Sequence, residues 1–323
     1  MRRRDLVTLL GGAAALWPLT TRAQSIPVVG FLSSDASEIR ERRFRAFRQG
    51  LIESGYIEGR NIAFEYRFSE ERFERLPSLA AELVNSGVAL IFASPTPAAN
   101  AVKAATKSIP VVFVVGVDPV QTGLVSSLAR PGGNLTGIAN LNLASKRLEL
   151  LHELLPTAKT IGYLVNPTNT AFAESEARDL KAAAQTLGVS LFIVNVTDPS
   201  GLDSAFAAIM AARPGGIVIS GESVFLGNSA RLVALASQYA VPAVYAIRGA
   251  TEAGGLVSYA ADPVDAARQA AVYAARILRG EKPENLPVQQ TTKVELIFNL
   301  KTAKALGLSV PPTLLVRADE VIE

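Results

Sequence analysis

Cysteine is absent from the 323 residues, and histidine occurs once. Without cysteine the chain can form no disulfide, no thiolate metal site and no acylated anchor at a processing site. The single histidine, His152, lies in the leucine-rich stretch LELLHELLP on an expected helix, far from any strand end. We interpret it as a surface or interface residue, which disfavours a Ser-His-Asp triad.

Catalytic and cofactor motifs are missing as well. The sequence contains no GxSxG elbow, no HExxH pair, no P-loop and no GxGxxG turn, and no carboxylate cluster has metal-ligand spacing. The sequence therefore predicts no catalytic residues, no metal and no cofactor.

Long hydrophobic runs are also lacking. After the basic residues 2–4, a mostly apolar run covers residues 6–19, about 14 residues against the about 20 that cross a bilayer. A basic start, a short apolar middle and Ala23 predict an export signal at residues 1–23, cleaved after Ala23. The paired arginines are typical of a twin-arginine signal, although Asp5 leaves the general secretory route open. A buried N-terminal helix is the alternative, which Pro18 disfavours.

Excess charge of one sign is absent once this segment is set aside. Residues 1–23 hold four of the 32 basic and one of the 29 acidic side chains, so the remainder carries 28 of each sign. A neutral chain gives no electrostatic reason to expect a nucleic acid as partner. We expect a periplasmic protein that does not span the membrane once processed.

What the sequence does contain is a regular alternation of apolar strands and amphipathic helices. The first half predicts strands at 26–32, 62–68, 88–93 and 109–115, and helices at 37–54, 75–85, 97–107 and 118–129. The second half predicts strands at 160–166, 189–196, 216–220, 242–246, 254–260 and 294–300, with helices at 146–155, 171–187, 202–212, 229–239, 264–279 and up to 306. Continuously apolar strands predict parallel sheets covered on both faces, hence two doubly wound α/β units.

Polar residues follow the predicted strands, at the sheet edge where α/β folds bind ligands. These candidates are Ser33, Ser34, Tyr66, Ser94, Thr96, Gly116 and Asp118 in the first unit, and Asn166, Asn169, Glu222, Tyr245 and Tyr259 in the second. Neutral donors at a helix start suit a carboxylate, an acid suits an ammonium group, and tyrosine faces suit an apolar body. The set favours recognition of a small solute over catalysis.

Each candidate also has a purely structural interpretation. Ser33, Ser34, Thr96, Asp118 and Asn166 are suitable helix N-caps. In the same way, Glu222 would be a solvated acid in a first helical turn, and the two late tyrosines would be core residues. The basic run at residues 40–48 is interpreted as a solvated helix face, with a docking surface as the alternative.

Several stretches of the chain resemble the ABC-transporter substrate-binding proteins, including the tryptophan- and phenylalanine-type members. These stretches are RRRDLVTLLGGAAALWP, AFRQGLIESGYIEGRNIAFEYRF, RLPSLAAELV, VVFVVGVDPVQTGLVSSLARPGGNLTGI, KRLELLHELLP and LPVQQTTKVELIFNLKTAKALGLSVPPTLLVRADEVIE. The resemblance implies the type I periplasmic-binding fold, in which a three-strand hinge crosses between lobes near Asn140, Tyr259 and Gln289. It implies a first lobe of residues 24–139 plus 261–289 and a second of 140–260 plus 290–323.

The resemblance also implies function and site residues. Thr96 and Asp118 match the family's TP and DP turns, Asn166 matches its NP turn, and Asn140 lies at the first crossing, whereas residues 221–229 depart from the family pattern. We expect a monomer that captures an amino acid or related carboxylate between its lobes and delivers it to ABC permease subunits. Thr96 would hold a carboxylate, and Asp118 or Glu222 an amine.

Two other functions stay open from the sequence. One is a ligand-sensing subunit for a membrane receptor, and the other is a secreted enzyme on the same fold. A cytosolic repressor core is disfavoured because the expected export signal occupies the place of a DNA-reading helix pair.

Overall fold

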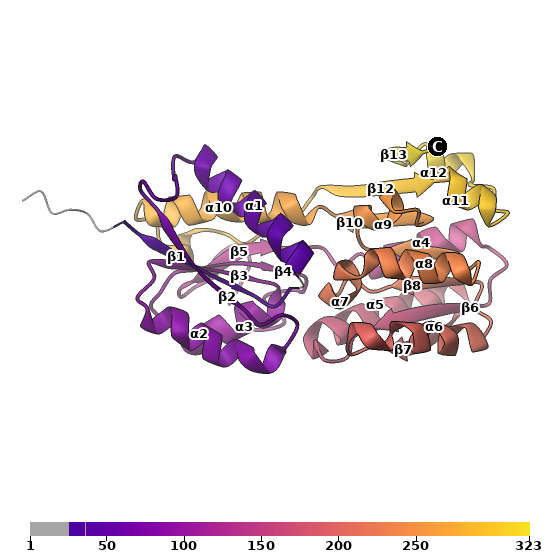
Figure 1. Ribbon diagram of the computed structural model, residues 1–323, viewed down its shortest axis with the longest axis horizontal. Helices are drawn as coiled ribbons and strands as arrows, with labels where there is room; N and C mark the ends of the chain where they lie inside the picture. The colour runs from indigo at the N-terminus through magenta and orange to yellow at the C-terminus, as the bar shows by residue number, and fades with distance from the viewer. Residues whose placement is uncertain (1–25, 36) are drawn as a thin grey trace, which may run out of the picture.

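The protein consists of two α/β lobes arranged side by side along its long axis (Figure 1). The computed structural model describes residues 26–35 and 37–323. The predicted export signal at residues 1–23 lies outside the described residues.

The first lobe is built on a parallel sheet in the order β11-β5-β4-β3-β1-β2. Its strands are β1 (Val28–Ser33), β2 (Ala63–Phe68), β3 (Leu90–Ser94), β4 (Val111–Val115), β5 (Leu135–Ala139) and β11 (Gln289–Gln290). Its helices are α1 (Ser37–Glu53), α2 (Leu76–Asn85), α3 (Thr96–Ala105) and α10 (Pro263–Leu278), with short 3-10 turns at Phe73–Arg75 and Pro283–Asn285. One apolar cluster lies under α1 and α10, and another lies under α2 and α3, so both faces of the sheet are covered.

The second lobe is built on a sheet in the order β13-β12-β10-β9-β8-β6-β7, parallel except where β12 pairs with β10. Its strands are β6 (Thr160–Val165), β7 (Ser190–Asn195), β8 (Gly216–Ile219), β9 (Ala243–Tyr245), β10 (Val257–Ala261), β12 (Val294–Asn299) and β13 (Glu320–Ile322). Its helices are α4 (Ala144–Leu154), α5 (Thr170–Leu187), α6 (Leu202–Ala211), α7 (Ser223–Gly227), α8 (Ser229–Gln238), α9 (Arg248–Glu252), α11 (Leu300–Ala305) and α12 (Pro312–Leu315), with a 3-10 turn at Pro199–Gly201.

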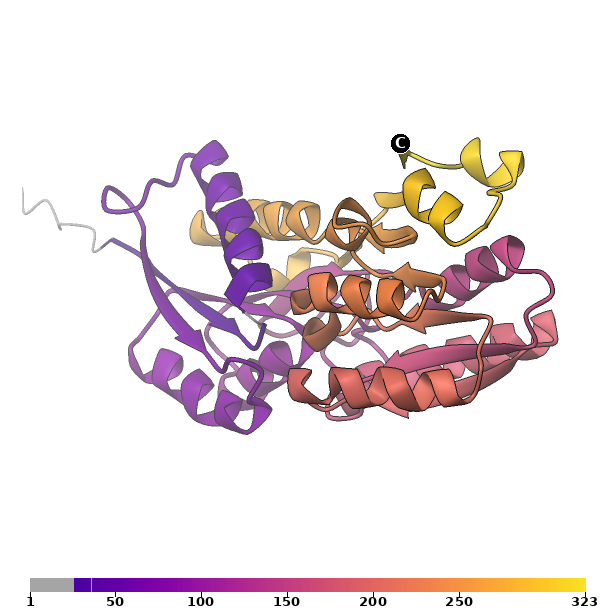
Figure 2. The same cartoon turned by 45° about the vertical axis from the view of Figure 1, so that its right-hand side comes forward.

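Helices cover both faces of this second sheet too. The clusters under α4 and α5 and under α6 and α8 bury opposite faces, while the C-terminal segment lies at the end of the molecule away from the first lobe (Figures 1 and 2). This architecture confirms the prediction of two doubly wound α/β lobes.

The chain passes between the two sheets three times. It crosses after β5, returns after β10 so that α10 packs on α1 of the first lobe, and crosses again between β11 and β12. Each lobe is therefore built from two separate segments of the chain.

The helix predicted at residues 118–129 is not formed. The chain forms local turns there instead: Asp118 O accepts from Thr122 N at 3.1 Å, Val120 O from Gly123 N at 2.9 Å and Pro119 O from Val125 N at 3.1 Å. Gly123 then takes a left-handed conformation, with φ of +69°, which ends the turn because helical residues have negative φ. The sequence reading also missed β5 and the short α7, which both lead into the site.

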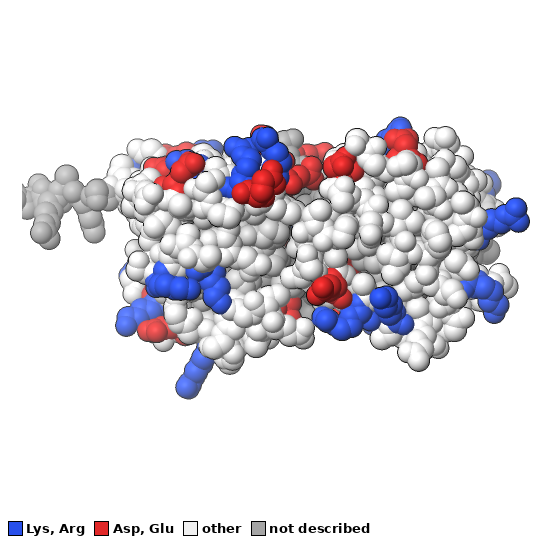
Figure 3. All heavy atoms as spheres, turned by 90° about the horizontal axis from the view of Figure 1, so that it is seen from below, with Lys and Arg blue, Asp and Glu red and all other residues white. Residues whose placement is uncertain are grey.

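Charges of both signs intermix on the lower face of the molecule (Figure 3). Figure 3 shows basic and acidic side chains next to one another rather than in a patch of one sign. Exposed ion pairs such as Arg67–Glu82, at 2.6 Å, account for part of this pattern. Within residues 26–35 and 37–323, every helix is too short or too polar to cross a membrane.

Candidate functional site

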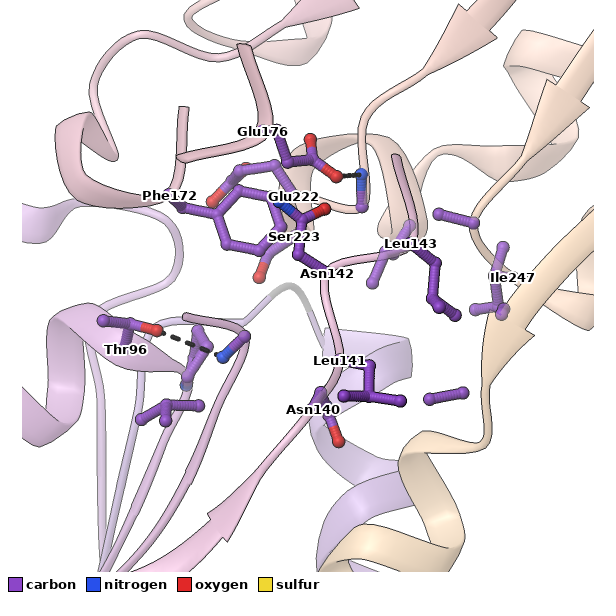
Figure 4. Close-up of a pocket in the computed structure, with 18 of the residues that line it drawn as sticks. Thr96, Asn140, Leu141, Asn142, Leu143, Phe172, Glu176, Glu222, Ser223 and Ile247 are labelled. Atoms are coloured by element: carbon purple, nitrogen blue, oxygen red, sulfur yellow. Dashed lines mark hydrogen bonds between the residues drawn. The ribbon is translucent and has the colours of Figure 1, made fainter. Parts of the chain in front are cut away.

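A cavity of about 90 Å³ lies between the lobes, where the carboxyl ends of strands from both sheets meet (Figure 4). Its polar lining includes Arg43, Thr96, Asn140, Asn142, Arg147, Asn169, Glu176, Glu222 and Ser223. Its apolar lining includes Leu141, Leu143, Phe172, Leu226, Ala246 and Ile247. A partly apolar hollow with a few converging polar groups has the character of a small-molecule site.

The wall from the first lobe is made by the loops after β3 and β4. Thr96 begins α3, is almost completely buried, and accepts the N–H of Gly116 through its Oγ1 at 3.3 Å. The first N–H groups of a helix have no partner within the helix, so this end of α3 favours a negative group. Asn140 follows β5, and its Oδ1 is a buried acceptor without a partner among the described residues.

The wall from the second lobe centres on Glu222, which caps α7. Its carboxylate accepts the N–H of Val224 at 3.0 Å and the side-chain amides of Asn166 and Asn169, each at 3.2 Å. The side chain is 3% exposed, and burial is the main cause that raises the pKa of Glu222. All three donors are neutral, so a ligand ammonium group would supply the missing positive charge.

A buried ion pair supports the same wall. Arg147 of α4 donates to Glu176 of α5 at 2.7 Å, and both side chains are almost fully buried. Glu176 also accepts from Tyr163 at 3.0 Å and from Ser220. Burial and the neighbouring carboxylate raise the pKa of Tyr163, so it remains a phenol that donates its proton. This network holds α4 and α5 at fixed positions beside the cavity.

Direct contacts join the two lobes, so they are closed on each other. Ser223 of the second lobe donates its hydroxyl to Asp35 of the first lobe at 2.7 Å. Ile39 of α1 belongs to the apolar cluster of the second lobe. The ring of Phe172, from the second lobe, packs on the apolar cluster of the first.

The basic run on α1 is only partly the solvated face that the sequence indicated: Arg45 and Arg48 are exposed, whereas Arg40 and Arg43 are not. Arg43 is 6% exposed, lines the cavity, and forms a 2.5 Å ion pair with Asp35. The guanidinium of Arg40 lies 4.1 Å from the ring centre of Phe68. These two side chains face inward because α1 packs beside the interface, which its charge pattern alone did not indicate.

Five of the predicted site residues line the cavity: Thr96, Gly116, Asn140, Asn169 and Glu222. Ser33, Ser34, Ser94 and Asn166 are buried just outside its lining, where Ser94 accepts from Arg43 at 3.3 Å and Asn166 donates to Glu222. Ser94 and Asn166 thus support lining residues, and none of the four forms part of the wall.

Asp118 lies elsewhere. It is exposed, its Oδ1 accepts from Val120 N at 2.8 Å, and it lines a separate cavity of about 180 Å³ together with Arg178 and Asp179. Asp118 was expected either to cap a helix or to hold a ligand amine. The structure has it cap its turn and does not bring it to the cavity that Glu222 lines.

The three tyrosines are not brought to the cavity either. Tyr66 packs edge-on against Phe44, with ring centres 4.9 Å apart, and burial raises the pKa of Tyr66 to about 12. Tyr245 is 2% exposed in the core of the second lobe, and Tyr259 packs on the other core cluster of that lobe. The rings of all three pack in apolar cores. For Tyr245 and Tyr259 this is the alternative interpretation that the sequence allowed.

Sequence reasoning missed several lining residues. Phe172 and Glu176 are four residues apart on α5, directly after a strand-end loop, and this helical spacing was a usable signal. Arg147 and Ser223 carried no such signal, because their position depends on how the chain crosses between lobes.

A second acidic group faces Glu222 across the interface. Glu71, from the loop after β2, lines a cavity of about 200 Å³ with Glu222, Asp198 and Arg72. Burial first, and then the charges of Glu222 and Asp35, raise the pKa of Glu71 above its ordinary value of 4.5. The closed protein therefore binds a proton at Glu71 more tightly than the unfolded chain does.

Replacing Glu71 by glutamine is expected to raise the melting temperature at pH 7 and to leave it unchanged near pH 4. The wild-type protein loses stability as the pH rises from 4.5 through the raised pKa of Glu71, and glutamine has no charge to bury. Thermal unfolding at both pH values measures the difference. Glu70→Gln, at a neighbouring exposed acid, is the matched control. An equal effect of Glu71→Gln at both pH values would contradict this account.

Comparison with known proteins adds an independent observation. The family model described as ABC transporter substrate binding protein matches residues 25–322. A tyrosine-binding protein of Clostridioides difficile is 26% identical over 264 residues, which cover 82% of this chain and 76% of that protein.

Solved structures are similar over almost the whole chain. A conserved domain protein of Vibrio cholerae is 29% identical with a TM-score of 0.85, covering 92% of this chain and 99% of that one. The ABC domain of Streptococcus pneumoniae in complex with L-Trp is 26% identical with a TM-score of 0.83, covering 92% of this chain and 100% of that one. Matched over nearly its full length, the chain belongs to the family of ABC transporter substrate-binding proteins.

Proposed function

We propose that this protein is the extracytoplasmic solute-binding component of an ABC importer and that its solute is an amino acid. The observation that carries the proposal is the charge arrangement of the cavity. Glu222 is a buried carboxylate with only neutral donors, while Thr96 and the start of α3 favour a negative group from the other lobe. A zwitterion matches both walls at once.

The proposed cycle begins with capture of the solute on one lobe. Closure then brings Glu222 to the ammonium group and forms the Ser223–Asp35 hydrogen bond between the lobes. Burial of most of the solute offsets the loss of water at its charged ends. The closed form docks on permease subunits, and a partner chain hydrolyses ATP.

The remaining expectations follow from this function. We propose that the chain is exported and processed after Ala23, that it acts as a monomer, and that the lobes are residues 24–139 plus 261–289 and 140–260 plus 290–323. The tyrosine-binding relative and the L-Trp complex support an amino acid as solute.

A thermal-shift screen of the purified protein tests the proposal. The panel holds the L-amino acids, small carboxylates without an amine, and purines. At about 100 times its dissociation constant, a true solute should add about 2.7 kcal/mol to the free energy of unfolding. Stabilisation by at least one amino acid and by none of the amine-free carboxylates is expected. Stabilisation by purines alone would contradict the proposal.

The partner is tested separately. Recovery of permease subunits with the solute-loaded protein is expected in a pull-down from membranes of the source cell. Recovery of a receptor without permease subunits would favour the sensor function instead.

A further inference from the structure

The ring of Phe172 occupies the space between the lobes. Phe172 lies in the first turn of α5 and projects into the interface (Figure 4). A Cβ atom built on Gly116 of the first lobe would lie 2.7 Å from Cε2 of the ring, and one on Gly221 of the second lobe would lie 3.5 Å from Cζ. The ring is thus seated between two glycines, one from each lobe, and a side chain at Gly116 would displace it.

The seated ring limits the room that is left for a solute. With Phe172 in place the cavity measures about 90 Å³. The aromatic ring of a solute would have to take the place of the Phe172 ring, whereas a short side chain needs less of the space between the lobes.

The neighbouring cavity offers no alternative place for an aromatic side chain. It shares Gly116, Asn140, Leu141 and Asn142 with the main cavity, but its other lining includes Asp118, Arg178 and Asp179. Placing an apolar ring there would remove water from charged groups without giving them a partner, which is costly. In the main cavity, Leu141, Leu226 and Ile247 provide an apolar surface for a short side chain.

We propose that Phe172 sets the upper size of the solute and that this protein selects amino acids with short aliphatic side chains over aromatic ones. The inference rests on the proposed amino-acid-binding function and narrows it to a substrate class. It also separates this chain from the relatives that are described with tyrosine and with L-Trp. Phe172 acts through exclusion: its ring is held by both lobes, so a larger solute can bind only if the ring leaves its seat and the closed contact is lost.

Isothermal titration of the purified wild-type protein, Phe172→Ala and Phe172→Leu with L-alanine, L-valine, L-tyrosine and L-tryptophan tests the proposal. The wild-type protein is expected to bind L-alanine or L-valine at least about tenfold more tightly than the aromatic pair, which is about 1.4 kcal/mol. Phe172→Ala should improve the affinity for the aromatic pair relative to L-alanine by at least about tenfold, and Phe172→Leu by less. Phe192→Ala, at an exposed phenylalanine of the same lobe, is the control and should not change the ratio.

The outcomes separate this inference from the function on which it rests. Tighter binding of L-tyrosine or L-tryptophan by the wild-type protein would overturn the size limit and leave amino-acid binding intact. An unchanged ratio in both Phe172 variants, with wild-type melting temperatures, would overturn the part assigned to Phe172. Absence of binding to any amino acid would overturn both proposals.

Discussion

Glutamine in place of Glu222 is expected to weaken amino-acid binding by about 30-fold or more. Glu222 is 3% exposed, and its carboxylate receives hydrogen bonds from the neutral donors Val224 N, Asn166 and Asn169. None of these donors is charged, so a ligand ammonium group would supply the positive charge that this carboxylate lacks among the described residues. Loss of one member of a buried, hydrogen-bonded charge pair costs about 2–5 kcal/mol, which sets the expected factor.

Titration calorimetry with the best amino acid from the thermal-shift screen measures the effect. Asp118→Asn is the matched control, because Asp118 is the other acid that the sequence offered for the amine, yet it caps an exposed turn outside the main cavity. We expect Asp118→Asn to change the affinity by less than about threefold, below 1 kcal/mol. The reverse order, with Asp118→Asn the more damaging change, would show that the amine lies in the second cavity.

Methionine in place of Arg147 is expected to lower the free energy of unfolding by about 3–5 kcal/mol. Arg147 and Glu176 are a buried ion pair at 2.7 Å, with side chains 4% and 2% exposed. Removing the guanidinium leaves a buried carboxylate without its counter-charge, and breaking a buried pair in this way has a cost of that size. Urea denaturation followed by circular dichroism measures the loss.

Two further variants make this result interpretable. Arg147→Met combined with Glu176→Gln removes both charges and keeps an acceptor for Tyr163, so most of the lost stability should return. Arg317→Met removes an exposed partner of Glu153, 2.9 Å away, and should cost less than about 1 kcal/mol. If the double variant were as unstable as Arg147→Met alone, the loss would come from packing and not from the unpaired charge.

The local segments were predictable because their patterns depend on near neighbours. The apolar run of β4 and the apolar stripe of α1 appear where the sequence predicted them. A strand buried on both faces is continuously apolar, and a helix buried on one face repeats its apolar residues with the helical period. The prediction of a helix at 118–129 was wrong because the helix-like spacing of apolar residues does not reveal that Gly123 takes a left-handed conformation. β5 was missed because LTGIA is short and mixed in polarity.

The site was predictable only in part, for a related reason. Strand-end reasoning identified Thr96, Gly116 and Glu222 correctly as lining residues, because parallel strands deliver their carboxyl ends to one edge. It could not choose between Asp118 and Glu222, which both follow a strand and both cap the next turn. Their surroundings differ in the folded lobes: Asn166 and Asn169 enclose Glu222, whereas Asp118 caps an exposed turn.

By itself the sequence determined the α/β class, the position of most strands and helices, and the sheet edge that lines the cavity, because these follow from the periodic placement of apolar residues along the chain. The tertiary structure alone decided which acid becomes buried, that Arg43 turns inward to Asp35, and that Phe172 is seated between Gly116 and Gly221. Those outcomes depend on how separate elements pack on one another, within a lobe and between the lobes, and local spacing along the chain carries no record of that packing.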